Sequence, residues 1–271
     1  MSTNAWRVIF HPPLDGPTNM AIDQAIMEAV STNIIAPTLR FYAWQPACLS
    51  LGYGQFSREA DMERITTHGW GLVRRATGGK AILHTDELTY SIAFPEDHPI
   101  VEGDILTSYR RLSAALLNGL HQLGVPAASM PLHETPTTTG PVCFEVPSNY
   151  EITFQDRKLI GSAQVRRSKA VLQHGSLPLW GDVARICDAL VFENEDERES
   201  AKIRVRQRAC TVEEALGYEL DWDKAAYTMA EAFGTTFDIP LDATDLSQDE
   251  EDRANQLAQE IYADPAWNFR R

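Results

Sequence analysis

Short runs of alternating apolar and polar residues fill the first two thirds of the chain, and this pattern predicts strands. Leu88, Tyr90 and Ile92, for example, alternate with polar residues. Residues 39–44 and 49–53 suggest two strands paired with each other. The predicted strands cover residues 6–10, 39–44, 49–53, 71–73, 88–92, 150–154, 158–165 and 170–179.

Apolar residues at helical spacing predict two helices between these strands. The first runs to Val30 and is capped by Thr18 or Asn19, and the second runs from Asp104 to Gln122. A short helix from Ser57 ends at Gly69. Beyond Asp182 the pattern is mainly helical, with capping boxes at Thr211-x-x-Glu214 and Ser247-x-x-Glu250. The charged segment 193–208 is expected to be a solvated helix or loop.

Short connections between the strands favour an antiparallel or mixed sheet over a doubly wound parallel one. The Gln155-Asp156 pair predicts a hairpin turn between residues 150–154 and 158–165. No internal repeat and no clear linker divides the chain of 271 residues. We therefore expect an α+β protein with a mixed β-sheet flanked by helices.

Composition and charge exclude several classes of function. A net charge of −14 argues against general nucleic-acid binding, which needs a basic surface. No apolar run approaches membrane-spanning length and no signal peptide is visible, so we expect a cytoplasmic protein without a membrane partner. The four cysteines show no C-x-x-C spacing, which argues against a structural zinc site.

The most distinctive stretch is RRATGGKAILH at residues 74–84. Adjacent glycines let the backbone approach a ligand closely, and neighbouring arginines can bind an oxyanion. A plain hairpin with exposed basic residues is the alternative. The stretch does not match the P-loop, and Gly52-Tyr53-Gly54 lacks the third glycine of the dinucleotide-binding fingerprint. We favour a binding site made by Arg74, Arg75, Thr77, Gly78, Gly79, Lys80 and His84.

A second group of candidate residues follows Cys143. On its own this cysteine is most simply a packed thiol, as are Cys48, Cys187 and Cys210. Two polar strands come after it, however. They carry Lys158, Gly161, Ser162 and Ala163, and then His174 and Gly175. A metal site built from His84, His174 and Cys143 is possible by residue type, but its spacing is not diagnostic.

Three motifs together resemble the lipoate-protein ligase A family. They are RRATGGKAILH, the R-K-x-x-G-S-A-Q run at 157–164 and H-G-S-L at 174–177. The resemblance extends over nearly the whole chain, including residues 19–23, 39–42 and 262–268. Val142-Cys143-Phe144 and the L-T-Y-S segment after His84 are most similar to the cysteine-dependent octanoyltransferases of this family.

The resemblance implies the biotin/lipoyl protein ligase catalytic fold. It places a catalytic core at 33–241, with extensions 1–32 and 242–271 packed on the same domain. Cys143 would be the nucleophile and acyl carrier, and Lys158 would lower its pKa. His84 and the Gly-Gly turn would line the acyl pocket, together with the other basic, small and histidine residues named above.

The implied reaction moves an octanoyl group from acyl carrier protein to a lysine of the glycine cleavage H protein or another lipoyl domain, in lipoate biosynthesis. It needs no cofactor and no metal. Three alternatives stay open: an ATP-dependent lipoate-protein ligase, an octanoyl amidotransferase between lipoyl domains, and a non-enzymatic scaffold. A family ligase tends to have a third glycine where Lys80 stands and D-x-G-N where Asp86-Glu87-Leu88-Thr89 stands. This departure argues against adenylate binding.

Overall fold

The structure is a computed structural model that describes residues 5–131 and 150–271. Eight strands form a mixed sheet in the order β11-β1-β2-β6-β10-β9-β8-β7, and three form a small sheet in the order β4-β3-β5. The β1 strand pairs in parallel with β2 and β11, and the other pairs of the large sheet are antiparallel. The α+β class with a mixed sheet is confirmed.

The strand bounds are β1 Trp6–Phe10, β2 Thr38–Tyr42, β3 Cys48–Leu51, β4 Gly71–Arg74, β5 Ile82–His84, β6 Glu87–Pro95, β7 Ala128–Pro131, β8 Tyr150–Phe154, β9 Arg157–Arg167, β10 Ala170–Pro178 and β11 Leu241–Ala243. The helices are α1 Gly16–Val30, η1 Ser57–Glu59, α2 Met62–Thr67, α3 Ile105–Gln122, η3 Val183–Ala189, α4 Glu195–Arg208, α5 Val212–Leu216, α6 Trp222–Phe237, α7 Gln248–Leu257, η4 Ala258–Tyr262 and α8 Pro265–Asn268. Among the described residues, no helix is long and apolar enough to cross a membrane.

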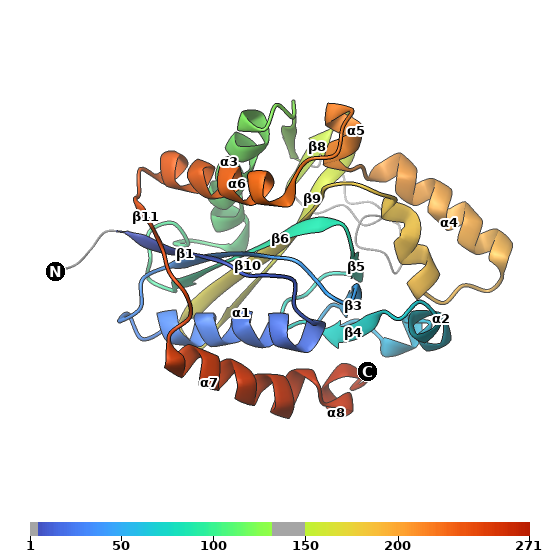
Figure 1. Ribbon diagram of the computed structural model, residues 1–271, viewed down its shortest axis with the longest axis horizontal. Coiled ribbons are helices and arrows are strands. Elements are labelled where there is room, and N and C mark those ends of the chain that lie inside the picture. The colour runs from blue at the N-terminus through green and yellow to red at the C-terminus, as the bar shows by residue number, and fades with distance from the viewer. Residues whose placement is uncertain (1–4, 132–149) are drawn as a thin grey trace.

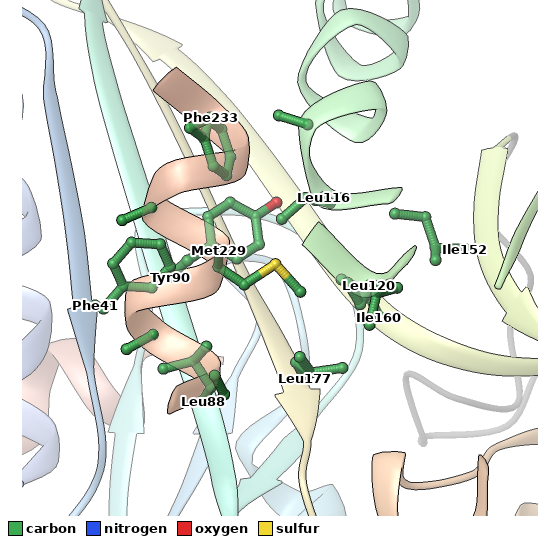
Figure 2. Close-up of a cluster of buried hydrophobic side chains, with 14 of the residues drawn as sticks. Phe41, Leu88, Tyr90, Leu116, Leu120, Ile152, Ile160, Leu177, Met229 and Phe233 are labelled. Carbon is green, nitrogen blue, oxygen red and sulfur yellow. The ribbon is translucent and has the colours of Figure 1, made fainter. Parts of the chain in front are cut away.

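Helices cover both faces of the large sheet (Figure 1). On one face, α3 and α6 pack on a core that includes Tyr90, Leu116 and Phe233 (Figure 2). On the other face, α1 lies between the sheet and α7. A third core joins the small sheet to α2, η3 and α4. The small sheet lies beside one end of the strands of the large sheet (Figure 1).

The predicted pairing of residues 39–44 with 49–53 is wrong. The β2 strand pairs with β1 and β6 in the large sheet, whereas β3 lies between β4 and β5 in the small sheet. The connection between them contains a cis peptide bond between Gln45 and Pro46. The Gly-Gly turn likewise joins β4 and β5, which both pair with β3 rather than with each other. Hydrophobic alternation predicts strands but does not specify their partners, because partner choice depends on distant residues.

Most turns and helix ends predicted from the local sequence are present in the structure. Both capping boxes form, and Asp104 caps α3 as expected. Gln155 and Asp156 both have positive φ, which is typical of a two-residue hairpin turn. The cap of α1 was assigned wrongly, because the carboxylate of Asp15, not Thr18 or Asn19, accepts the backbone N–H of Thr18. Ser57 begins a single 3₁₀ turn, and Asp61 caps the helix that follows.

We expect Phe233→Ala to destabilise the protein by about 3–5 kcal/mol, because it empties a fully buried position between α6 and the sheet. Ile203→Ala, on a side chain that is 55% exposed, should change the free energy of unfolding by less than about 0.5 kcal/mol. Urea unfolding followed by circular dichroism measures both variants. Similar midpoints for the two would contradict this assignment of the core.

Candidate active site

A cavity of about 440 Å³, including its open mouth, lies behind the Gly-Gly turn, and residues of both sheets line it. Eight of the candidate residues meet there, although they come from three separate segments of the chain. These eight are Arg75, Gly79, His84, Gly161, Ser162, Ala163, His174 and Gly175. The remaining lining residues are Met20, Tyr42, Trp44, Ser50, Ile82, Thr89 and Ser176.

A chain of buried hydrogen bonds reaches the turn from α1. Arg40, which is fully buried, pairs with Asp23 at 2.8 Å, and His174 Nδ1 lies 3.3 Å from Asp23 Oδ2. On the far side of the ring, His174 Nε2 lies 2.6 Å from Thr77 Oγ1. This chain therefore ties a carboxylate on α1 to the residue that precedes Gly78.

Protonation states follow from these surroundings. Burial lowers the pKa of His174 and outweighs its hydrogen bond to Asp23, so the ring is neutral near pH 7. Burial opposes ionisation of Asp23, but hydrogen bonds from His174 and Ser91 and the charge of Arg40 lower its pKa overall. Asp23 is thus a carboxylate, and it requires Nδ1 of His174 to carry the proton. Thr77 then donates its hydroxyl proton to Nε2.

A second chain reaches the same turn from β6. His84 Nδ1 lies 2.6 Å from Glu87 Oε1, and His84 Nε2 lies 2.8 Å from Ser50 Oγ. Ser50 Oγ also accepts a hydrogen bond from Arg75 at 3.1 Å. The guanidinium of Arg75 donates to the carbonyl oxygens of Gly78, at 2.9 Å, and Lys80, at 2.7 Å. Arg75 therefore holds the turn from inside, and it also lines the cavity.

The wall of the cavity is polar by composition, yet its polar groups bond to one another. Both nitrogens of His84 and of His174 have protein partners. Ser162 Oγ lies 2.7 Å from the hydroxyl of Tyr90, and Ser176 donates to Glu87. Because satisfied polar atoms face each other, the wall can present carbon to a bound molecule. Such a wall suits an apolar chain.

Two positions around the cavity require glycine, one for its backbone conformation and one for lack of space. Gly79 has φ +94°, a conformation that favours glycine. A Cβ on Gly175 would lie 2.5 Å from Ser162 Oγ and 2.6 Å from the Tyr90 ring. Gly175 thus lets β9 and the core aromatic close around the cavity.

Arg74 and Lys80 are not among the lining residues. Arg74 is buried and donates to the backbone carbonyls of Gly52, Gln55 and Asn268, so it anchors the C-terminal segment beside the turn. Lys80 is half-buried, and its carbonyl oxygen accepts from Arg75. Gly78 is exposed at the tip of the turn.

Lys158 is buried on β9, and its ammonium lies 2.9 Å from Glu151 Oε1 on β8. Cys143 lies outside the described residues. Cys48, Cys187 and Cys210 are buried thiols. Burial raises the pKa of the thiols of Cys48 and Cys210, the latter to about 12, as expected of packed thiols. Within the described ranges, no group of three or more His, Cys, Asp or Glu side chains could hold a metal ion.

Sequence reasoning did not single out Asp23, Arg40, Ser50 or Glu87. An acidic residue in an apolar helical stripe, as at Asp23, was an available signal, because a buried charge needs a partner. Glu87 offered a weaker one, as an acidic residue at the start of an alternating strand. Neither signal identifies the partner.

The family model described as the lipoyl protein ligase A/B catalytic domain matches residues 15–234, and the chain belongs to this family.

Relatives match the chain from end to end. It is 40% identical over 274 residues to the octanoyltransferase LipM of Moorella thermoacetica and 34% identical over 278 residues to that of Bacillus subtilis, and each comparison covers 100% of both proteins. It is 37% identical over 277 residues to the octanoyltransferase LipM of Symbiobacterium thermophilum, again over 100% of both proteins.

Solved structures share the fold. A bipartite lipoate protein ligase from Thermoplasma acidophilum superimposes with a TM-score of 0.82 at 24% identity, covering 98% of this chain and 96% of that one. A lipoate-protein ligase A bound with ATP gives a TM-score of 0.81 at 23% identity, covering 98% of both chains. The expected biotin/lipoyl protein ligase fold is confirmed.

Burial lowers the pKa of three histidines, His11 (to about 4), His98 and His174. Since an unfolded histidine titrates near 6.5, the unfolded chain takes up protons below that pH that the folded chain does not. Stability should therefore fall as the pH drops from 7 to 5. Buried carboxylates with lowered pKa, such as Asp23, lose their contribution only below about pH 4. Urea midpoints at pH 7.5, 6 and 5 test this, and identical midpoints would contradict it.

Proposed function

We propose that this protein is an octanoyltransferase of lipoate assembly, with Cys143 as the acyl carrier. The observation that carries the proposal is that relatives 34–40% identical over their whole length bear that name. The carbon-walled cavity beside the Gly-Gly turn supports it, because each buried methylene of an acyl chain contributes about 0.8 kcal/mol.

In the proposed first half-reaction, the Cys143 thiolate attacks the octanoyl thioester of acyl carrier protein. A tetrahedral oxyanion forms, the carrier thiolate leaves, and the octanoyl group remains on Cys143 as a thioester. In the second half, the neutral amine of an acceptor lysine attacks this thioester. The amine passes a proton to the departing sulfur and an amide forms. Thioester exchange is nearly balanced, and amide formation from a thioester is downhill, so neither step needs ATP.

Lys158 is proposed to favour the thiolate form of Cys143, since a nearby ammonium stabilises an anion. The contact between Lys158 and Glu151 limits this effect. A carboxylate 2.9 Å away offsets part of the positive charge that a thiolate would meet. Glu151 should therefore moderate the effect of Lys158.

The acceptor is proposed to be a lysine of the glycine cleavage H protein or another lipoyl domain. We place the reaction in the cytoplasm, because a nucleophilic thiol needs reducing conditions. The division into a core at 33–241 with extensions 1–32 and 242–271 also stays a prediction. The ATP-dependent ligase is not favoured: the full-length relatives carry a transferase name, and the structural likeness to ligases lies below 25% identity.

Cys143→Ala should lower octanoyl transfer by about 10³-fold or more, because the covalent carrier is lost. Intact-mass spectrometry of the wild type mixed with octanoyl-acyl carrier protein should show one octanoyl adduct without ATP. Cys48→Ala, at a buried thiol outside the cavity lining, serves as the matched control and should still form the adduct. An adduct that needs ATP, or one that persists in Cys143→Ala, would reject the transferase mechanism.

Lys158→Ala should slow alkylation of Cys143 by iodoacetamide at pH 7, because the thiolate fraction falls. Glu151→Gln should speed this alkylation, since it removes the offsetting charge. The site of labelling is read by peptide mass spectrometry, with Lys224→Ala, an exposed lysine on α6, as the control. An unchanged pH profile in Lys158→Ala would remove this lysine from the activating role.

A further inference from the structure

Glu87 lies behind the cavity wall, where three side chains converge on its carboxylate. It is 4% exposed, and it is not one of the residues that line the cavity. His84 donates to it at 2.6 Å, and Thr89 and Ser176 both donate to it through their hydroxyls. All three of these partners do line the cavity. The carboxylate is thus one common acceptor for a large part of the wall.

The Thr89 branch continues to an aromatic ring. Trp44 Nε1 donates to Thr89 Oγ1 at 2.8 Å, so the indole is held through Thr89 by the same carboxylate that holds His84. The two rings stack, with centroids 4.0 Å apart and planes 9° from parallel. His84 is the last residue of β5, and Trp44 lies just after the end of β2. Glu87 therefore fixes both members of one flat wall.

The charge state of Glu87 matters for this role. Burial opposes ionisation, but the charge of His84 and the hydrogen bonds from His84, Ser176 and Thr89 lower the pKa of the Glu87 carboxyl overall. An ionised carboxylate accepts from all three donors at once. An amide at the same place would turn an N–H₂ group toward one or more of them. The surrounding donors would then have to rotate, and the stacked rings would lose a fixed position.

We propose that Glu87 is a positioning residue that determines acyl chain length, by holding the stacked Trp44–His84 pair as a rigid wall of the cavity. It touches neither the acyl chain nor the reacting atoms and acts through the two rings. The inference rests on the proposed function for the identity of the acyl group. The dependence of the wall on Glu87 follows from the hydrogen bonds alone.

The experiment measures binding rather than turnover, so that it does not depend on Cys143 chemistry. Isothermal titration with hexanoate, octanoate, decanoate and dodecanoate gives a chain-length profile for each variant. A rigid wall predicts that affinity rises about 15-fold from hexanoate to octanoate, for two buried methylenes, and then stops rising. In Glu87→Gln the decanoate-to-octanoate affinity ratio should increase by at least about fourfold, the equivalent of one methylene.

Glu250→Gln is the matched control. Glu250 is also a buried, hydrogen-bonded carboxylate, 3% exposed, but it pairs with Arg7 beside α7, away from the cavity. It should lower the unfolding midpoint and leave the chain-length ratio as in the wild type. Thr89→Val is the second test variant, because it removes the link to Trp44 and keeps that to His84. It should raise the ratio in the same direction as Glu87→Gln.

A wild-type ratio in a folded Glu87→Gln protein would overturn the proposal. If Glu87→Gln does not fold, a wild-type ratio in Thr89→Val overturns it instead, as does a wild type that binds none of the four acids. Failure of the proposed function is distinguishable. If the wild type shows the Glu87-dependent chain-length profile but forms no octanoyl adduct, the positioning role of Glu87 is supported and the transferase function is rejected.

Discussion

Buried charge is the constraint on which the rest of the structure depends. Arg40, Asp23 and Glu87 lie almost entirely out of water, and each unpaired charge there would cost several kcal/mol. The fold meets this requirement by bringing strands and a helix together from distant parts of the chain. The side chains that satisfy these charges are the same ones that shape the cavity. Stability and site geometry are therefore coupled.

That coupling explains how a polar set of residues can make a surface for an apolar chain. His84 and His174 each bond to a carboxylate on one ring nitrogen and to a hydroxyl on the other. Their hydrogen-bonding capacity is used within the protein, and carbon is left to face the cavity. The two hydroxyls belong to Ser50 and Thr77. Ser50 accepts a hydrogen bond from Arg75, which also bonds to the Gly-Gly turn, and Thr77 directly precedes the turn. The turn is thus held on both sides by a carboxylate–histidine pair.

The arginines beside the turn show why residue type alone is an incomplete guide. Both are candidate ligand-binding residues by type, because a guanidinium suits an oxyanion. In the fold, Arg74 ties the C-terminal segment to the loop after β3, and Arg75 closes the turn on itself. A guanidinium satisfies backbone carbonyls as readily as anions, and carbonyls are abundant wherever loops converge.

The sequence by itself determined most of the local structure and part of the cavity lining. Alternation, caps and turn residues predicted most strands and helices, since these depend on neighbours within a few residues. The motifs also named eight residues that do meet at one cavity. Only the tertiary structure decided that β2 and β3 belong to different sheets, and that Asp23 and Glu87 stand behind the two histidines. Strand partners and buried ion pairs join residues far apart in the chain, and their energies depend on three-dimensional proximity that no local pattern records.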